Sequence, residues 1–257
     1  MSAKHSAPAP TPILAPILAS FFVFAIAPFV LGSCSGAVDV LVRNDSSARV
    51  AVRLEVPAVL SQRVRQFGQI PATAPLFDSA SVRKEFGVRK TIHLIDVAVP
   101  DDDSMTSVLW VPDLKAFADD KSLAPSGLLG YTAIPASGDA PALRELRVRL
   151  SRQNAVAAFS LFPGLDGRLV ESLSPPALEK DPVSALEYRM NLETVIIGKK
   201  SMPAFDACNV EMTFTAPRSI IASSGGTAAG QTFKVRIPIF DLLTLEKPVE
   251  FWMRWAE

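Results

Sequence analysis

Alternating apolar and polar residues mark both ends of this chain as β-structure. Near the start, Val38, Val40 and Val42 alternate with polar residues, a polar turn covers residues 44–47, and residues 50–56 alternate again. Period-two alternation on both sides of a polar turn predicts a β-hairpin. The same kind of pattern predicts further strands over residues 92–97, 108–111, 146–150, 210–214, 233–239 and 249–255.

Between these strands, apolar residues spaced three or four positions apart predict short helices. Most of them open on a cap residue or a proline, and they cover residues 57–68, 78–87, 112–117, 151–162 and 181–198. The last helix is the most regular, with Asp181 as its N-cap and Gly198 just past its end. Its apolar stripe is predicted to consist of Val183, Leu186, Met190 and Ile197.

Strands at both ends and helices in the middle predict an α+β fold, with a largely antiparallel β-sheet and several short helices packed on it. Few spacings suit the regular crossovers of a parallel sheet. Residues 122–141 are rich in Pro, Gly, Ala and Ser, which predicts an extended loop or a break between subdomains. We expect a single domain over residues 34–257.

An uncharged apolar run precedes this domain. Lys4 and His5 lie before it, the run extends over residues 13–31, and Leu31-Gly32-Ser33-Cys34 closes it. A charged start, an apolar middle and small residues at the end are the parts of a secretory signal. The run is long enough to span a membrane, but Pro16 and Pro28 disfavour a continuous helix. An uncleaved anchor and an ordinary cleaved signal remain open alternatives.

The segment ending in Leu31-Gly32-Ser33-Cys34 resembles the signal peptides of bacterial lipoproteins, in a looser version similar to spirochaetal lipoboxes. The resemblance implies a signal peptide over residues 1–33, cleavage between Ser33 and Cys34, and acyl chains, palmitate among them, on Cys34. Two or more chains give stable attachment to a membrane. By analogy with sorting in bacteria with two membranes, Ser35 after the cysteine favours the outer membrane, on a periplasmic or a surface face.

Composition excludes one class of partner. Removal of the first 33 of the 257 residues leaves 224, enough for a sizeable core. Loss of Lys4 leaves 25 basic residues against 26 acidic ones. A balanced charge gives no electrostatic case for nucleic-acid binding.

Candidate chemistry is sparse. With Cys34 acylated, Cys208 has no cysteine to pair with, and its place before a strand predicts a buried small side chain. His93 is the one histidine of the mature chain, and no Gly-x-Ser-x-Gly motif is present, so we expect His93 on a strand face and not in a triad. The run Asp101-Asp102-Asp103 lacks the spacing of a calcium loop and predicts a solvated turn.

These observations predict a protein without catalytic residues, metal site or cofactor. Zinc would need three or four suitable ligands, which the chain does not group in any recognisable motif. A hydrolase with a scattered pair of carboxylates stays open, because 26 acidic residues always permit some pair.

The pattern from Val210 to Trp255 resembles the LppM-type lipoprotein domain, through Thr215-Ala216-Pro217 and the turn Ser223-Ser224-Gly225-Gly226. That resemblance implies an envelope domain with an apolar, lipid-accommodating interior. The chain also has 15 Phe but only 2 Tyr, and its short amphipathic helices could line an apolar pocket or dip into a bilayer surface.

Two functions fit these patterns. The first is a lipid-anchored envelope protein that binds a hydrophobic ligand or membrane lipid, although the sequence assigns no ligand-binding residue. The second is a structural or assembly lipoprotein that binds another envelope protein, with hairpin edges and the aromatic strand Phe251–Trp255 as its contact surface through strand addition.

Overall fold

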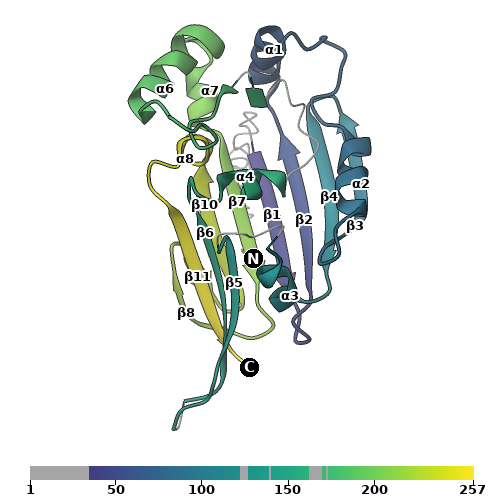
Figure 1. Ribbon diagram of the computed structural model, residues 1–257, viewed down its shortest axis with the longest axis vertical. Helices are drawn as coiled ribbons and strands as arrows, with labels where there is room; N and C mark the ends of the chain where they lie inside the picture. The colour runs from purple at the N-terminus through teal and green to yellow at the C-terminus, as the bar shows by residue number, and fades with distance from the viewer. Residues whose placement is uncertain (1–34, 122–126, 139, 162–169, 172) are drawn as a thin grey trace, which may run out of the picture. The chain divides into compact units, whose positions relative to one another are not determined.

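A seven-stranded sheet, here called sheet 1, forms the larger layer of the computed structural model (Figure 1). The structure describes residues 35–121, 127–138, 140–161, 170–171 and 173–257. The strand order in sheet 1 is β3-β4-β2-β1-β7-β10-β9, and all neighbours are antiparallel except β1 and β7. The strands are β1 (Ser35–Val42), β2 (Ala48–Glu55), β3 (His93–Asp101), β4 (Ser104–Val111), β7 (Asn209–Thr215), β9 (Thr227–Ala229) and β10 (Thr232–Pro238).

A second, four-stranded sheet, sheet 2, has the order β5-β6-β11-β8 and is antiparallel throughout. Its strands are β5 (Leu129–Ile134), β6 (Leu143–Leu150), β8 (Ile220–Ser224) and β11 (Val249–Ala256). β5 lies within residues 122–141, so the expectation of an extended loop there is wrong for residues 129–134. The segment pairs with β6 through Tyr131, which lies opposite Leu146 with both side chains buried.

The predicted N-terminal hairpin is confirmed as β1 and β2. Val38, Val40 and Val42 are buried on one face of β1, whereas Asp39 and Leu41 between them are exposed. The two strands pair in antiparallel register, with Val38 opposite Val52. Because side chains alternate across a strand, this single register turns Val38, Val40 and Val42 toward the core together with the residues opposite them, Val52, Val50 and Ala48.

The apolar faces of the two sheets meet in one core. Phe214 and Phe233 of sheet 1 pack against Phe251 of sheet 2, with ring centroids 5.5 and 6.1 Å from the Phe251 ring. Trp255 is 2% exposed and packs against Tyr131, 6.2 Å between ring centroids. Tilted aromatic pairs of this kind add roughly 0.5–1.5 kcal/mol each beyond the apolar area that they bury.

The chain crosses from sheet 2 to sheet 1 at the turn Gly225-Gly226. A Cβ atom on Gly225 would lie 2.4 Å from the Glu250 carbonyl oxygen, and one on Gly226 would lie 2.7 Å from the Phe233 ring. Gly225 also has a φ of +78°, which favours glycine. The two glycines therefore permit close approach of the turn to both sheets, and the turn is a packed crossing and not a flexible linker.

Seven α-helices and one π-helix among the described residues connect these strands. Two of these helices begin at aspartate N-caps: Asp78 accepts from the backbone N–H of Ala80, and Asp113 accepts from the N–H groups of Lys115 and Ala116. The helices are α1 (Ala58–Phe67), α2 (Ser79–Gly87), α3 (Leu114–Asp119), α4 (Ala155–Ser160), α6 (Ala185–Asn191), π-helix η1 (Leu192–Ile196), α7 (Met202–Asp206) and α8 (Ile239–Thr244).

Two predicted caps are wrong. The helix expected from residue 151 begins at Ala155, because Asn154 bonds back to the N–H of Ser151 and the carbonyl of Arg149 and so ends the preceding strand. The helix expected from residue 181 begins at Ala185, where the Ser184 hydroxyl accepts from the N–H of Glu187. At α6 the Ser184 side chain therefore satisfies a free N–H group of the first turn, whereas the Asn154 side chain at α4 makes no such bond to the helix.

The α+β fold, with mostly antiparallel sheets and short helices, is confirmed. Within the described ranges, the helices are all too short or too polar to cross a membrane. The apolar run at residues 13–31 and the lipobox lie outside those ranges.

Candidate functional site

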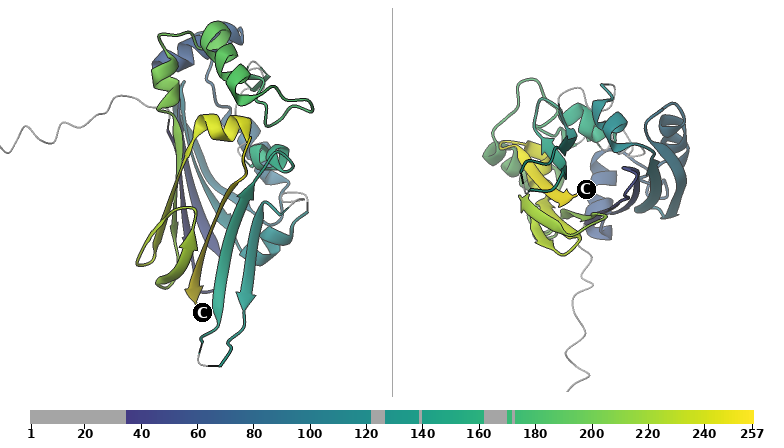
Figure 2. Two further views of the ribbon diagram at one scale, coloured as in Figure 1. Left: turned by 90° about the vertical axis from the view of Figure 1, so that its left-hand side faces the viewer. Right: turned by 90° about the horizontal axis from the view of Figure 1, so that it is seen from below.

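The first described residue, Ser35, lies at the end of sheet 1 where several helices gather. Ser35 pairs with Glu55 on one side and with Asn209 on the other. Helix α1 begins three residues after Glu55, and α7 ends three residues before Asn209. Figure 1 and the side view in Figure 2 show α1, α6 and α7 together at this end, which we call the helical end, while the C-terminus lies at the opposite end.

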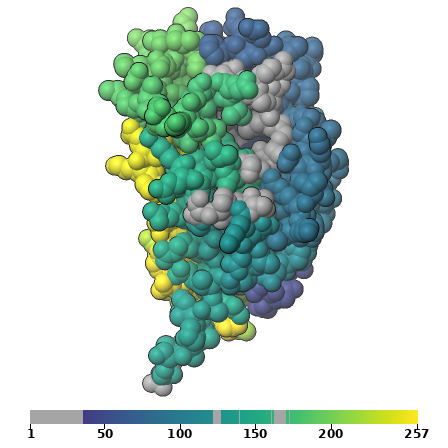
Figure 3. All heavy atoms as spheres, viewed as in Figure 1, coloured from purple at the N-terminus to yellow at the C-terminus, as the bar shows by residue number. Residues whose placement is uncertain are grey.

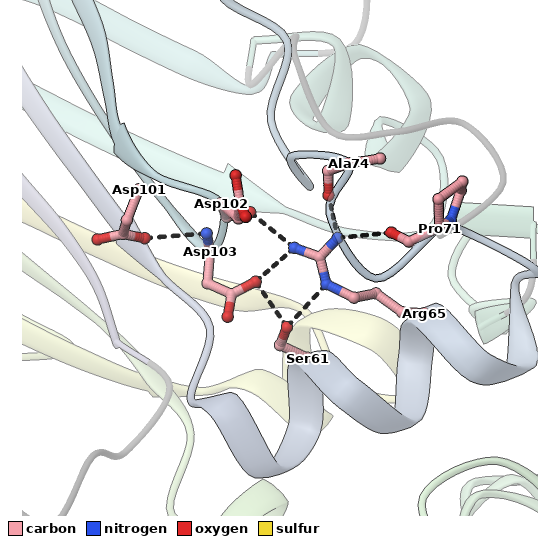
Figure 4. A network of polar contacts seen from close by, with 7 residues as sticks. All are labelled: Ser61, Arg65, Pro71, Ala74, Asp101, Asp102 and Asp103. Atoms are coloured by element: carbon pink, nitrogen blue, oxygen red, sulfur yellow. Dashed lines mark hydrogen bonds and ion pairs between the residues drawn. The ribbon is translucent and has the colours of Figure 1, made fainter.

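A polar network fixes α1 to the turn between β3 and β4 (Figure 4). The Arg65 side chain is 7% exposed and donates to the Asp103 carboxylate at 2.6 Å and to the Ser61 hydroxyl at 3.1 Å. It also donates to three backbone carbonyls, those of Pro71, Ala74 and Asp102. Five acceptors match the five N–H groups of a guanidinium, so the buried cation is fully satisfied.

The expectation of a solvated turn at residues 101–103 is thus only partly right. The turn exists, and Asp101 and Asp102 are exposed. Asp103, however, points toward α1, where it accepts from both Arg65 and the Ser61 hydroxyl at 2.6 Å. The pairing joins residues about 40 positions apart, so no local sequence pattern could reveal it.

Helix α6 and the π-helix η1 form one continuous rod with two apolar stripes. Tyr188, Leu192 and Ile197 are buried on the inner side, spaced by four and then five residues. The five-residue step follows from the π-turn, in which the N–H of Ile197 donates to the Leu192 carbonyl at 2.7 Å. The inner stripe therefore stays aligned across the change of helix type.

The outer stripe of this rod is apolar as well. Leu186, Met190 and Val195 precede the three inner residues by two positions each, which is about 200° around a helix. Their side chains are 70%, 53% and 62% exposed. The predicted core stripe is therefore wrong for Leu186 and Met190, which face solvent, and it is right for Ile197.

Two further contacts hold the rod in place. Arg189 forms a two-pronged ion pair with Asp206 of α7, at 2.6 and 2.7 Å, and this pairing lowers the pKa of the Asp206 carboxyl. The Tyr188 hydroxyl donates to the Leu173 carbonyl at 2.9 Å, and burial raises the pKa of that hydroxyl. The rod is thus held on one side by α7 and on the other by the chain around Leu173.

A cavity of about 540 Å³ opens between this rod, α1 and residues 171–183. Its size lies within the range of roughly 300–1,000 Å³ that is typical of small-molecule sites. Apolar side chains form one part of its wall, namely Phe67, Leu173, Pro176, Val183, Val195 and Ile196. Three exposed acidic side chains, Glu171, Glu179 and Asp181, stand around it, together with Ser174 and Asn191.

Exposed apolar side chains gather at the same end. Eleven large apolar side chains are exposed among the described residues, and six of them lie on α1, on α6–η1 or just before α6: Val59, Phe67, Val183, Leu186, Met190 and Val195. Three of these six also line the cavity. Figure 3 shows the dark-blue atoms of α1 and the green atoms of α6 at the same end of the surface.

The residues that the sequence singled out do not meet at this cavity. Ser33 and Cys34 lie outside the described residues. His93 is exposed on the edge strand β3, opposite Trp110, which agrees with the expected strand-face position. Cys208 is buried, as expected, and its thiol donates to the Ala204 carbonyl at 3.3 Å.

Strand addition at Phe251–Trp255 is contradicted by the sheet order. These residues belong to β11, which pairs with β6 on one side and with β8 on the other. Both rows of backbone hydrogen-bonding groups are occupied, so no partner strand can add there. The alternating aromatic pattern reflects a central strand packed on the core, with Phe251, Met253 and Trp255 buried.

Within the part of the chain that the structure describes, no group of three or more His, Cys, Asp or Glu side chains is placed to hold a metal ion. The acidic side chains with the densest contacts are structural. Glu145 accepts from Arg254 of the neighbouring strand β11 at 2.5 Å and from Arg147 of its own strand β6 at 3.1 Å. Burial alone would raise the pKa of Glu145, but the hydrogen bonds from the two arginines outweigh it and lower the pKa.

The comparisons with known proteins give weak structural likenesses. No protein-family model and no curated protein matches the chain. The folded domain of LppM from Mycobacterium tuberculosis aligns over 88% of this chain and 91% of its own length, with a TM-score of 0.37 and 8% identity. Yeast LTA4 hydrolase in complex with bestatin aligns over 87% of this chain but only 28% of its own length, with a TM-score of 0.34 and 10% identity. The fold therefore has a weak structural resemblance to the LppM domain and also to part of a much larger enzyme.

Proposed function

We propose that this chain is a non-enzymatic lipoprotein of the cell envelope, anchored through acyl chains on Cys34, which binds a hydrophobic ligand in the cavity at its helical end. One observation carries the proposal. A cavity of about 540 Å³, with apolar side chains along one part of its wall, opens at the end of the fold where Ser35 begins β1. An anchor on Cys34 would hold this end of the fold near the membrane, so a lipid could pass from the bilayer into the cavity over a short distance.

The wall and the surrounding charges define the class of ligand. Phe67, Leu173 and Ile196 offer apolar surface to an acyl chain or another hydrocarbon group. The carboxylates of Glu171, Glu179 and Asp181 stand around the same cavity and repel a phosphate. The proposed ligand therefore has an apolar tail and a neutral or cationic head.

Localisation follows from the anchor in this proposal. Ser35 after the acylated cysteine favours the outer membrane, on either its periplasmic or its surface face. The membrane is then the first partner of the protein, through the lipid on Cys34. Binding of another envelope protein is the competing function, and it needs a surface other than β11.

The anchor is tested by metabolic labelling of the full chain with radioactive palmitate. Label should enter the natural chain and be absent from Cys34→Ala, and mass spectrometry should find the modified residue at the new N-terminus. An unlabelled protein that keeps residues 1–33 would refute the anchor and favour an uncleaved span.

Ligand binding is tested by native mass spectrometry of the full, acylated chain in detergent, followed by solvent extraction. A tryptophan at Ile196, which lines the cavity but does not belong to the exposed apolar positions of the rod, should fill the cavity and remove the bound species. Val156→Trp is the matched control, because Val156 is 69% exposed on α4 and does not line the cavity. A chain that carries no extractable lipid, but purifies with a stoichiometric protein, would favour the assembly function instead.

A further inference from the structure

We propose that the outer stripe of α6–η1, formed by Leu186, Met190 and Val195, lies on the membrane surface beside the lipid anchor. The inference rests on the anchoring part of the proposed function, and it adds the orientation of the domain. Sheet 1 then stands with its helical end toward the bilayer, and the C-terminus points away from it.

The first argument is the stripe itself. A surface helix normally presents polar residues to water, whereas this rod presents three large apolar side chains that are more than half exposed. The inner side of the same rod is already occupied, since Tyr188, Leu192 and Ile197 are buried. The outer stripe is thus a second apolar face that the core of the described domain does not cover.

The second argument is the position of the anchor. Ser35 is already part of β1, paired with Glu55 and Asn209, so a lipid on Cys34 is attached one residue from the sheet. Such a short connection leaves no linker that could hold the domain away from the bilayer. Ser35 lies at the helical end, so an anchor on the preceding residue would join the domain there.

The third argument is charge, which decides the kind of contact. Residues 171–200 carry five acidic side chains and four basic ones, so this surface has no excess of positive charge. Attraction to anionic headgroups therefore cannot drive the contact. Insertion of apolar side chains at the boundary between headgroups and acyl chains can drive the contact, and such a contact should not depend on salt.

A second copy of this chain is the competing occupant of the stripe. The position of the anchor favours the membrane, because the stripe and the acyl chains then enter the same bilayer from one end of the domain. A dimer through the stripe would instead have to form with both anchors at the interface.

The test uses the full, acylated chain in vesicles of phosphatidylcholine, with one environment-sensitive fluorophore on an introduced cysteine. Cys208 is 1% exposed and should stay unlabelled, and acylation blocks Cys34. The introduced cysteines are Met190→Cys and Val195→Cys, so that failure of one variant leaves the other. Val156→Cys, equally exposed on α4, is the matched control.

Nitroxide-bearing lipids should quench the fluorophore at positions 190 and 195 but not at position 156. Adding Leu186→Asp to the Val195→Cys chain should weaken the contact roughly tenfold or more, because a charge replaces an inserted leucine. The quenching should persist at 1 M salt, at which the Debye length is about 3 Å.

Four outcomes separate the possibilities. Quenching at 190 and 195 in an acylated chain supports the orientation. An acylated chain without quenching at either site refutes the orientation and leaves the anchor intact, whereas a chain without acyl groups refutes the anchor. If the fluorophores at both sites instead become shielded from water as the protein concentration rises, without quenching by lipid, the inference is overturned in favour of a dimer.

Discussion

Removal of the Asp103 carboxylate should destabilise the domain, because Arg65 would lose its only anionic partner in the network of Figure 4. Arg65 is 7% exposed at its side chain, and Asp103 is 29% exposed. Loss of one partner from a fully buried ion pair costs roughly 3–5 kcal/mol. Asp103→Ala should fall at the lower end of that range, since the other four acceptors of Arg65 remain and water can reach the vacated position.

The structure supports a value of about 3 kcal/mol for Asp103→Ala. About 2 kcal/mol comes from the weakly compensated guanidinium, and about 1 kcal/mol comes from the Ser61 hydroxyl, which loses its acceptor. In a domain of this size each kcal/mol lowers Tm by about 2–4 °C, so Tm should fall by about 6–12 °C. The Tm of Asp103→Asn should lie between those of the natural chain and of Asp103→Ala, because an amide oxygen keeps the hydrogen bonds without the charge.

Thermal unfolding of the full chain in detergent, followed by circular dichroism, measures this difference. Asp102→Ala is the matched control, because the Asp102 side chain is exposed and only its backbone carbonyl accepts from Arg65. The control should stay within about 0.5 kcal/mol of the natural chain. Equal losses in the two variants, or no loss in Asp103→Ala, would refute the role assigned to the buried pair.

Three further predictions concern other parts of the fold. Gly226→Ala should lower the free energy of unfolding by about 1–3 kcal/mol, and Tm with it, because the added Cβ would lie 2.7 Å from the Phe233 ring. Gly87→Ala is the control: its added Cβ meets nothing within 4 Å, so Tm should not fall. Glu145 has a lowered pKa in the fold, so its contribution to stability is present above the unfolded value of 4.5 and is lost as the pH falls through the folded pKa. Between pH 7 and pH 3 the Tm of the natural chain should therefore fall further than the Tm of Glu145→Gln. Equal falls in Tm for the two proteins would contradict a stabilising role of the Glu145 carboxylate. Ser184→Ala should cost about 1 kcal/mol through loss of the N-cap of α6, measured by urea unfolding, and an unchanged midpoint would remove Ser184 from that role.

The strands and several helix caps could be predicted because their sequence patterns are local. Alternation in β1 and β2 is visible because one face of each strand packs on the core and the other meets water. Asp78 and Asp113 were predictable as N-caps because the acceptor and the N–H groups that it serves lie within three residues of each other. The same locality makes the α+β class readable from the chain.

The outer stripe of α6–η1 shows where this kind of reasoning ends. Residues 183–197 contain two apolar stripes offset by two positions, and periodicity alone cannot decide which of them faces the core. The π-turn also adds one residue to the inner spacing between Leu192 and Ile197, which a helical period of 3.6 does not anticipate. Packing against the rest of the fold selected Tyr188, Leu192 and Ile197 for burial.

Long-range partners explain the remaining gap. Arg65 and Asp103 lie on separate elements, and the cavity is built from α1 together with residues more than 100 positions later. The central place of β11 depends on two neighbours, β6 and β8, that the pattern of Phe251–Trp255 does not name. Each of these features is a property of the topology, and the sequence shows only the residues that take part.

The pairing of β1 with β7 has a consequence for the order in which the domain can form. β1 is the first strand of the fold, yet its parallel neighbour β7 begins at residue 209 of 257. Contacts of such long sequence separation form slowly. Sheet 1 therefore stays open along this edge of β1 until residues 209–215 have been synthesised, and until then the edge can pair with the wrong strand.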